Sequence, residues 1–239
     1  MTDRGDGGGD AADRSTGHGE DSAGKHRAPA RVRDVYDEIA EHFAETRAHP
    51  WPEVRDFLEE YDFPEASVGL DLGCGNGRHA ALLGEYVETV LALDVSRALL
   101  RTARARMRRD GWEAALLQGT AETLPIGDDT VDLAVYVATL HHLPDREARV
   151  RSLSELARVL TDDGRGLVSV WSIEHERFDA DAGFDTTIDW TLPDGETLDR
   201  FYHIYDRSEF ETDLHASDLR IERLFVSSGN GYAVVRCAP

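Results

Sequence analysis

The segment from Val68 to Gly77 limits the possible folds of this chain more than any other feature of the sequence. Its first half, Val68-Gly-Leu-Asp-Leu72, is typical of a short buried strand, and its second half, Gly73-Cys-Gly-Asn-Gly77, is a turn with glycine at every other position. Glycines let the backbone come close to a ligand. In an open α/β sheet, ligands bind where a strand ends and the next helix begins. The segment therefore predicts an α/β fold with a ligand site at the carboxyl end of its first strand.

Strand and helix signals alternate along the rest of the chain. Further strands are predicted at residues 89–94, 114–118, 131–136, 167–171, 221–226 and 232–237. Helices are predicted after Ser96 and Asp145, two residues of the type that caps helix N-termini. The second of these helices is expected to stop at Gly164. Because parallel strands are joined by crossover helices, this alternation implies a parallel sheet with helices on both faces.

Three stretches fall outside this alternation. Residues 1–30 are rich in Gly, Asp, Ser and Ala and have almost nothing to bury, so we expect a disordered, acidic and Gly-rich tail. Residues 31–62 contain two predicted helices, the second of which starts at Pro52. Residues 172–200 are acidic and contain several aromatic residues, which predicts a functional excursion above the sheet. We therefore expect one folded domain over residues 31–239.

The charge composition is strongly acidic. The chain has 26 Lys and Arg against 47 Asp and Glu, a formal net charge of -21, and Lys25 is its only lysine. Such a composition is typical of adaptation to high intracellular salt, where the Debye length falls to roughly 3 Å and self-repulsion is screened. We therefore expect a halophilic archaeon as the source, with an ordinary acidic protein as the alternative. The acidity is also weak evidence against a nucleic-acid substrate.

Cysteine usage and hydropathy exclude several classes of protein. Only Cys74 and Cys237 are present, too few for a disulfide framework or a four-cysteine zinc site, and we expect no metal. No apolar run approaches the roughly 20 residues of a membrane span, and the N-terminus lacks the apolar core of a signal peptide. These features predict a cytoplasmic protein without a membrane partner.

The residues around the Gly-rich turn favour one cofactor. Asp94 ends the second predicted strand, where its carboxylate can accept hydrogen bonds from both hydroxyls of a ribose. A dinucleotide site normally has the spacing Gly-x-Gly-x-x-Gly and holds a pyrophosphate at the helix N-terminus. Here the Asp71 carboxylate beside the turn would repel a pyrophosphate but attract the ammonium group of a methionine moiety. These features favour S-adenosylmethionine over NAD, and a tight turn that binds no ligand is the structural alternative.

At these residues the chain resembles the class I S-adenosylmethionine-dependent methyltransferases. Their first motif has the form Asp-x-Gly-x-Gly-x-Gly, and the segment from Gln118 to Pro125 resembles the one that lines the adenine. The resemblance implies a Rossmann-like, doubly wound sheet of seven strands that is mostly parallel, with an antiparallel C-terminal strand. Thr120 stands where many relatives have Asp, which weakens the expected adenine contact. The implied cofactor-binding residues are Asp71, Gly73, Cys74, Gly75, Asn76, Gly77, Asp94, Val95, Thr120, Ala121 and Val137.

Several segments outside the cofactor motif share a more particular pattern. They are Val35–Arg47, Pro50–Pro52, His141–His142, Trp171, Asp189–Pro193 and Phe201–Tyr205. These segments resemble the tRNA wobble-uridine carboxyl methyltransferases, which esterify 5-carboxymethyluridine, and the resemblance implies a tRNA substrate. Two features depart from that family: Ala48 stands where an aromatic residue is frequent, and the excursion lacks the basic tracts of some members.

The chemistry of such a reaction requires positioning rather than a base. A carboxylate is already ionised at pH 7, so its attack on a sulfonium methyl group needs no general base. An arginine can hold a carboxylate with two parallel hydrogen bonds, and Arg47 is our candidate for this role. The candidate catalytic residues are Arg47, His141 and His142. The candidate substrate-binding residues, with the tryptophans as platforms for a base, are Arg47, His49, Trp51, Trp171, Tyr202 and His203.

Structural alternatives stand beside these roles. Arg47 sits where a cation stabilises the C-terminus of the preceding helix. One of His141 and His142 is expected to pack inside the domain, because adjacent residues leaving a strand point apart. Trp171 is equally explained as a core residue. The functional alternatives are methylation of a small molecule, such as a quinone precursor or a carboxylic acid, and a non-catalytic paralogue that binds the cofactor.

The third predicted strand suggests a protein partner. In methyltransferases of this topology it lies at one edge of the sheet, and here it contains four apolar residues in a row, from Ala114 to Leu117. Exposed edge strands pair readily with another chain. The resemblance implies a small zinc-binding activator subunit along this edge, with Trp112, Leu116 and Leu117 in or beside the contact. The alternative is that helices on both faces of the sheet require an apolar strand.

Overall fold

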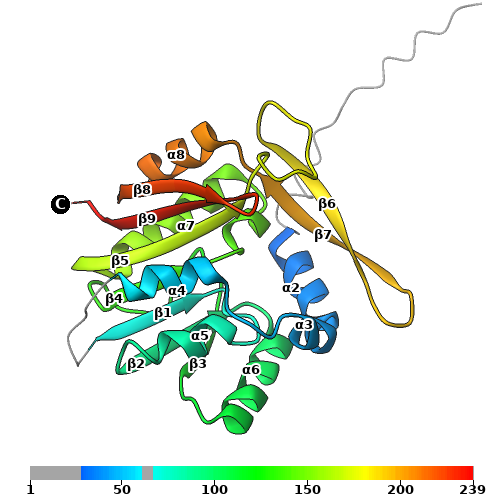
Figure 1. The fold of residues 1–239 in the computed structure, drawn as a ribbon, viewed down its shortest axis with the longest axis horizontal. Coiled ribbons are helices and arrows are strands. Elements are labelled where there is room, and N and C mark those ends of the chain that lie inside the picture. The colour runs from blue at the N-terminus through cyan, green and yellow to red at the C-terminus, as the bar shows by residue number, and fades with distance from the viewer. Residues whose placement is uncertain (1–27, 61–66, 239) are drawn as a thin grey trace, which may run out of the picture.

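A seven-stranded sheet forms the centre of the computed structural model, which describes residues 28–60 and 67–238. Its strand order is β3-β2-β1-β4-β5-β9-β8 (Figure 1). The strands are β1 (Val68–Leu72), β2 (Thr89–Asp94), β3 (Ala115–Gln118), β4 (Val131–Tyr136), β5 (Leu160–Trp171), β8 (Leu219–Ser227) and β9 (Asn230–Cys237). Of the tail expected at residues 1–30, residues 1–27 lie outside the described part of the chain.

The pairing directions confirm the expected doubly wound fold. Strands β1 to β5 pair in parallel, and β9 runs antiparallel to both of its neighbours, β5 and β8. The prediction of a mostly parallel sheet with an antiparallel C-terminal strand is therefore confirmed. Antiparallel neighbours need only a tight turn, and the turn from β8 to β9 has Ser228 and Gly229 at positive φ.

Helices cover both faces of the sheet. Over one face lie α4 (Pro52–Glu59), α5 (Arg78–Leu83) and α6 (Arg97–Asp110), and over the other lie α7 (Arg146–Val159) and α8 (Arg207–Ala216) (Figure 1). Successive residues of β4 divide between the two cores: Leu133 and Val135 belong to the core with α4 and α5, and Ala134 and Tyr136 to the core with α7. A strand buried on both faces requires this apolar continuity. None of the helices in the described ranges is long and apolar enough to cross a membrane.

The predicted helix starts are confirmed by their caps. The Ser96 side chain accepts a hydrogen bond from the Leu99 N–H (3.1 Å) at the start of α6. The Asp145 side chain accepts one from the Ala148 N–H (2.9 Å) at the start of α7. Pro52 begins α4, because its missing N–H has no partner to lose in the first turn.

Three features of the helices differ from the sequence prediction. The helix expected before Pro50 is two helices, α2 (Ala28–Glu38) and α3 (Ala40–Thr46), with a break at the fully buried Ile39; α2 also begins before the domain start expected at residue 31. Helix α7 ends at Val159 rather than near Gly164. Leu160 pairs with Val131 of β4, so sheet pairing replaces the last helical turn.

The excursion folds into an antiparallel hairpin. Its strands, β6 (Phe184–Thr191) and β7 (Thr197–Ile204), form a separate two-stranded sheet. A small core of Ile188, Tyr202 and Ile204 holds the hairpin together. Strand β7 packs against α2 and places the hairpin beside α2 and α3, which we call the lid helices (Figure 1).

Candidate active site

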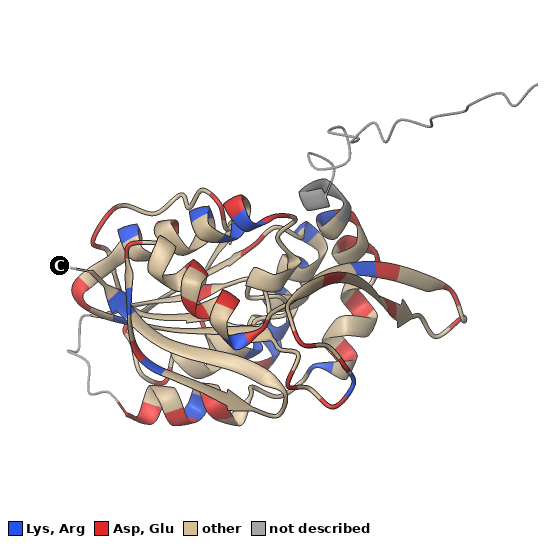
Figure 2. Ribbon diagram, turned by 90° about the horizontal axis from the view of Figure 1, so that it is seen from above, with Lys and Arg blue, Asp and Glu red and all other residues tan. Residues whose placement is uncertain are grey.

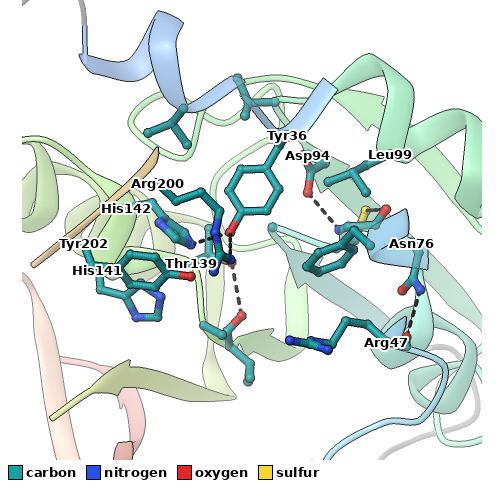
Figure 3. Close-up of a pocket in the computed structure, with 18 of the residues that line it drawn as sticks. Tyr36, Arg47, Asn76, Asp94, Leu99, Thr139, His141, His142, Arg200 and Tyr202 are labelled. Atoms are coloured by element: carbon teal, nitrogen blue, oxygen red, sulfur yellow. Dashed lines mark hydrogen bonds between the residues drawn. The ribbon is translucent and has the colours of Figure 1, made fainter. Parts of the chain in front are cut away.

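A cavity of about 510 Å³ lies at the carboxyl ends of β1, β2 and β4. The Gly-rich turn, the lid helices, the short helix η1 (Leu140–His142) and the β6–β7 hairpin form its wall (Figure 3). Most predicted site residues line it: Arg47, Trp51, Gly73, Cys74, Gly75, Asn76, Asp94, Val95, Thr120, Ala121, Val137, His141, His142, Trp171 and Tyr202. Four predicted residues lie outside the lining: His49, Asp71, Gly77 and His203.

The Gly-rich turn is shaped for close contact with a ligand. Gly73 and Gly75 have φ angles of +76° and +53°, in the left-handed region that favours glycine. A Cβ on Gly73 would lie 2.1 Å from the Thr139 hydroxyl oxygen, so no larger residue fits there. The backbone N–H groups of Gly73 and Cys74 both donate to the Leu93 carbonyl (2.8 and 2.9 Å). These bonds fix the turn against β2.

Asp94 joins this turn to the turn after β2. Its Oδ2 accepts a hydrogen bond from the Gly75 N–H (2.8 Å), and its Oδ1 accepts one from the Ser96 N–H (2.8 Å). Burial raises the pKa of Asp94 to about 6, although the backbone hydrogen bonds act in the opposite direction. Each carboxylate oxygen can accept a further hydrogen bond. Two ribose hydroxyls could therefore complete the hydrogen bonding of Asp94.

Asp71 lies on β1 directly before the Gly-rich turn, as expected, and it is buried. It was expected to face the ammonium group of a methionine moiety, but it is 1% exposed and lies outside the cavity lining. Its carboxylate accepts a hydrogen bond from the backbone N–H of Ala80, near the start of α5, and burial raises its pKa to about 7. This hydrogen bond supports the first turn of α5. The Asp71 Oδ2 atom is buried and has no hydrogen-bond partner among the described residues, so its contact with an ammonium group stays a prediction.

Asn76 connects the turn to the lid. Its Nδ2 donates to the Ala44 carbonyl (3.3 Å) and the Arg47 carbonyl (2.9 Å). Its Oδ1 is buried and has no hydrogen-bond partner within the described part of the chain. Because Asn76 lines the cavity, this oxygen could accept a hydrogen bond from an ammonium group. The orphaned oxygen, the open glycines and Asp94 together fit S-adenosylmethionine.

His142 is held as a neutral ring. Its Nδ1 lies 2.8 Å from the Phe201 carbonyl oxygen, and its Nε2 lies 2.9 Å from the Tyr36 hydroxyl oxygen. A carbonyl can only accept, so Nδ1 carries the proton and Nε2 accepts from Tyr36. Burial lowers the pKa of His142 to about 4, which keeps the ring neutral at pH 7. Arg200 extends this chain of hydrogen bonds, since its Nη1 donates to the Tyr36 hydroxyl (3.4 Å) (Figure 3).

His141 belongs to a row of four stacked rings. The centroid distances are 5.0 Å from His141 to Tyr202, 4.9 Å from Tyr202 to Trp171 and 5.6 Å from Trp171 to His175. The Trp171 backbone N–H also donates to His141 Nδ1 (3.1 Å). Because two rings already stack on Trp171, the geometry favours its structural alternative over a platform for a base. The row makes this part of the cavity wall rigid.

Two arginines and a tryptophan meet in the cavity wall. The guanidinium carbons of Arg47 and Arg200 lie 5.3 and 4.8 Å from the Trp190 ring centroid, and Trp190 Nε1 donates to His42 Nδ1 on α3 (3.1 Å). Arg47 Nη1 donates to the Thr46 carbonyl (3.2 Å) at the end of α3, as the capping alternative predicts, but Arg47 also lines the cavity. Neither arginine has a carboxylate partner among the residues that the structure describes. Both are therefore available to an anion.

Arg200 and Trp190 were not among the predicted site residues, although strand alternation in the sequence points to Arg200. Alternate residues of a strand share a face. Arg200 precedes Tyr202, a predicted site residue, by two positions, and Trp190 follows Ile188 by two. The hairpin register then pairs Ile188 with Arg200, which gathers these side chains on the face toward the cavity.

Three predicted residues have other surroundings than expected. His203 lies between two carboxylates, with its Nδ1 2.7 Å from Asp185 Oδ1 and its Nε2 2.8 Å from Glu209 Oε1. Strand alternation explains this, because His203 and Tyr202 point to opposite faces of β7. His49 is exposed between α3 and α4. Gly77 precedes α5 with φ +76°, where a Cβ would meet the Trp112 ring at 2.6 Å.

Within the described ranges, no group of three or more His, Cys, Asp or Glu could hold a metal ion.

We predict that binding of S-adenosylhomocysteine weakens at acid pH because Asp94 becomes protonated. With a pKa of about 6, Asp94 is mostly ionised at pH 8 and mostly protonated at pH 5. A protonated carboxyl group is a poorer acceptor, so the affinity measured by calorimetry should fall about tenfold over this range. The Asp94→Asn variant should bind weakly at both pH values. A variant that retains the full pH dependence would show that another group is responsible.

Several known proteins that are similar to this chain are methyltransferases. Residues 70–168 match the family described as methyltransferase domain. The chain is 30% identical over 168 residues to the tRNA (carboxymethyluridine(34)-5-O)-methyltransferase of Schizosaccharomyces pombe. The aligned region covers 67% of this chain and 68% of that protein. The chain is also 34% identical over 145 residues to the tRNA (carboxymethyluridine(34)-5-O)-methyltransferase ALKBH8 of Mus musculus. That aligned region covers 61% of this chain but only 20% of the mouse protein. The matched part is thus about a fifth of the mouse relative.

A solved structure shares the fold. The 1,6-didemethyltoxoflavin-N1-methyltransferase of Burkholderia thailandensis, solved with 1,6-didemethyltoxoflavin and S-adenosylhomocysteine, has a TM-score of 0.69 at 19% identity, over 90% of this chain and 91% of that one. At this identity the likeness supports the Rossmann-like fold alone. The matched domain and the relative from S. pombe show that the chain belongs to the class I S-adenosylmethionine-dependent methyltransferases and is similar to their tRNA (carboxymethyluridine(34)-5-O)-methyltransferase members.

Proposed function

We propose that this chain transfers the methyl group of S-adenosylmethionine to the carboxylate of 5-carboxymethyluridine at the wobble position of tRNA. The observation that carries the proposal is the group of Arg47, Arg200 and Trp190 in the cavity wall. Guanidinium groups bind carboxylates through paired hydrogen bonds, and the buried Trp190 ring holds both guanidinium groups beside the cavity. The chain has a net charge of -21, yet neither of these two arginines has a carboxylate partner among the described residues. An anionic substrate requires such unpaired cations. The names of the relatives support the same substrate.

The reaction places few chemical demands on the protein. A carboxylate oxygen forms a bond to the methyl carbon while the carbon–sulfur bond breaks, and no proton moves. S-adenosylmethionine, when bound, supplies the electrophilic methyl group on a positively charged sulfur. Arg47 and Arg200 would orient the carboxylate, and an enclosed cavity would exclude the water that otherwise solvates it. His142, neutral at pH 7, and the stacked His141 would act by shaping the wall, so their candidate catalytic role is one of positioning.

Deletion of the gene should change one nucleoside of cellular tRNA. Without methyl transfer, 5-carboxymethyluridine should accumulate and its methyl ester should disappear, because the carboxylate is the proposed acceptor. Mass spectrometry of tRNA nucleosides from the deletion strain and its parent measures both species, and a restored gene serves as control. Unchanged ester in the deletion strain would contradict the proposal and favour a small-molecule substrate.

Replacing either cavity arginine by lysine should impair methyl transfer but not cofactor binding. An ammonium group cannot form the paired hydrogen bonds of a guanidinium. A charge-assisted hydrogen bond contributes about 1.5–3 kcal/mol, so kcat/KM should fall about 10- to 100-fold in Arg47→Lys and in Arg200→Lys. Assays with tRNA that carries carboxymethyluridine measure this, and calorimetry with S-adenosylhomocysteine should give wild-type affinity. Arg55→Lys, an exposed site on α4, is the control, and near-normal turnover of both cavity variants would rule out the clamp.

We also propose a protein partner at the edge of the sheet. Strand β3 is the edge strand, as predicted, and Leu116 and Leu117 are half-buried there while Ala115 is exposed. An edge strand offers a row of backbone groups to an added strand. The Trp112 ring instead packs toward Gly77, so it lies beside such a contact rather than in it. The expected occupant is a small zinc-binding activator subunit.

The chain purified alone should be poorly soluble or poorly active, because its edge strand lacks a partner. Co-expression with the candidate subunit should give a soluble heterodimer with full activity, as measured by size-exclusion chromatography and a methyl-transfer assay. A chain that is monomeric, soluble and fully active by itself would exclude an obligatory subunit.

A further inference from the structure

Helix α6 concentrates positive charge in a strongly acidic chain. Its 14 residues include six arginines and one acidic residue, Asp110, whereas the whole chain has a net charge of -21. Asp and Glu are spread over the helices, the loops and the hairpin (Figure 2). A helix of the opposite sign therefore stands out on a surface that otherwise repels anions.

Four of these arginines form one exposed row, which we call the arginine stripe. Its members are Arg97, Arg101, Arg104 and Arg108. Spacings of four, three and four residues place them within an arc of about 60° along about 16 Å of the helix. No ion pair with another described residue involves the stripe. By contrast, Arg106 and Arg109 on other faces of α6 both pair with Asp110, at 3.4 and 2.7 Å.

The stripe begins beside the cavity. Asp37 of the lid helix α2 accepts hydrogen bonds from Ser96 Oγ (2.7 Å) and from the Ala98 N–H (2.9 Å), the residues on either side of Arg97. Leu99 lines the cavity itself. Figure 1 shows α6 running from beside the lid helix α3 to the lower edge of the domain. A polymer with one unit in the cavity could therefore continue past the N-terminus of α6 and along the stripe.

The stripe has the chemistry of a phosphate-binding surface rather than of a protein interface. Guanidinium groups bind phosphates bidentately, and residues three or four apart on a helix lie about 5–6 Å apart. The centre of a protein interface is depleted in charge and enriched in apolar and aromatic side chains. Helix α6 exposes no large apolar side chain. Among the described residues, the one large hydrophobic side chain that is exposed is Val226 on β8.

We propose that the arginine stripe binds the sugar–phosphate backbone of the tRNA whose wobble nucleotide enters the cavity. The inference rests on the proposed function and adds the surface that holds the rest of the RNA. Phosphate contacts fix the register of a nucleic acid without reading its sequence. The stripe would thus supply affinity and orientation, and the cavity would supply selectivity for the modified base.

The salt dependence of tRNA binding by the full chain tests the stripe. Fluorescence anisotropy with an unmodified tRNA transcript gives the binding constant between about 0.1 and 0.5 M KCl. The triple variant R101Q/R104Q/R108Q removes three phosphate contacts. It should lower the slope of log K against log salt by about 2–3, and weaken binding at least about tenfold at the lowest salt.

A matched triple variant separates the stripe from net charge. R55Q/R207Q/R220Q removes the same charge from exposed sites on α4, α8 and β8, and it should change the slope by less than about 1. Calorimetry with S-adenosylhomocysteine verifies that both variants are folded. Equal slopes for the two triple variants would overturn the proposal, and this is the result expected if the stripe binds a protein partner instead. A wild-type chain that binds no tRNA would also overturn it. Stripe-dependent binding together with unchanged methyl ester in the tRNA of the deletion strain would uphold the stripe and reject the proposed substrate.

Discussion

The two backbone hydrogen bonds of Asp94 hold the cavity in its shape. One carboxylate oxygen binds the Gly75 N–H in the turn after β1, and the other binds the Ser96 N–H in the turn after β2. Ser96 caps α6 and donates to Asp37 on the lid. A single buried carboxylate therefore sets the positions of the Gly-rich turn, the start of α6 and the lid relative to one another. Both the cofactor end of the cavity and the start of the arginine stripe depend on it.

This arrangement has an energetic consequence. Burial raises the pKa of Asp94 to about 6 and that of Asp71 to about 7, so each ionised carboxylate destabilises the cofactor-free fold as the pH rises through these values. Asp94 lines the cavity, so hydrogen-bond donors from a ligand would offset the free-energy cost of its buried charge. Asp71 lies outside the lining, so a ligand would not offset its cost directly. Groups with pKa values shifted in this way are concentrated at functional sites. The turn is thus organised for binding at the expense of stability.

Local features of the sequence predicted the fold and the cofactor end of the site. The alternating strands, the caps at Ser96 and Asp145 and the Gly-rich turn depend on neighbouring residues, so their pattern is visible in the chain. The substrate end depends on contacts between distant segments. Trp190 is positioned by His42, 148 residues away, and by a hairpin register that residue types alone do not determine. The misplacement of His203 has a local origin instead, because strand alternation turns its side chain to the face opposite that of Tyr202.

The distribution of arginine resolves the tension between an acidic chain and an anionic substrate. Other arginines make direct ion pairs, such as Arg146 with Asp213, Arg158 with Glu155 and Arg223 with Glu60. In the high-salt solvent that the composition predicts, charges interact over roughly 3 Å, so a net charge of -21 would not repel RNA at a distance. Direct contacts then decide binding, and a guanidinium retains directional hydrogen bonds where a point charge is screened. Unpaired arginines in the cavity and on α6 are therefore compatible with a surface that is acidic almost everywhere else.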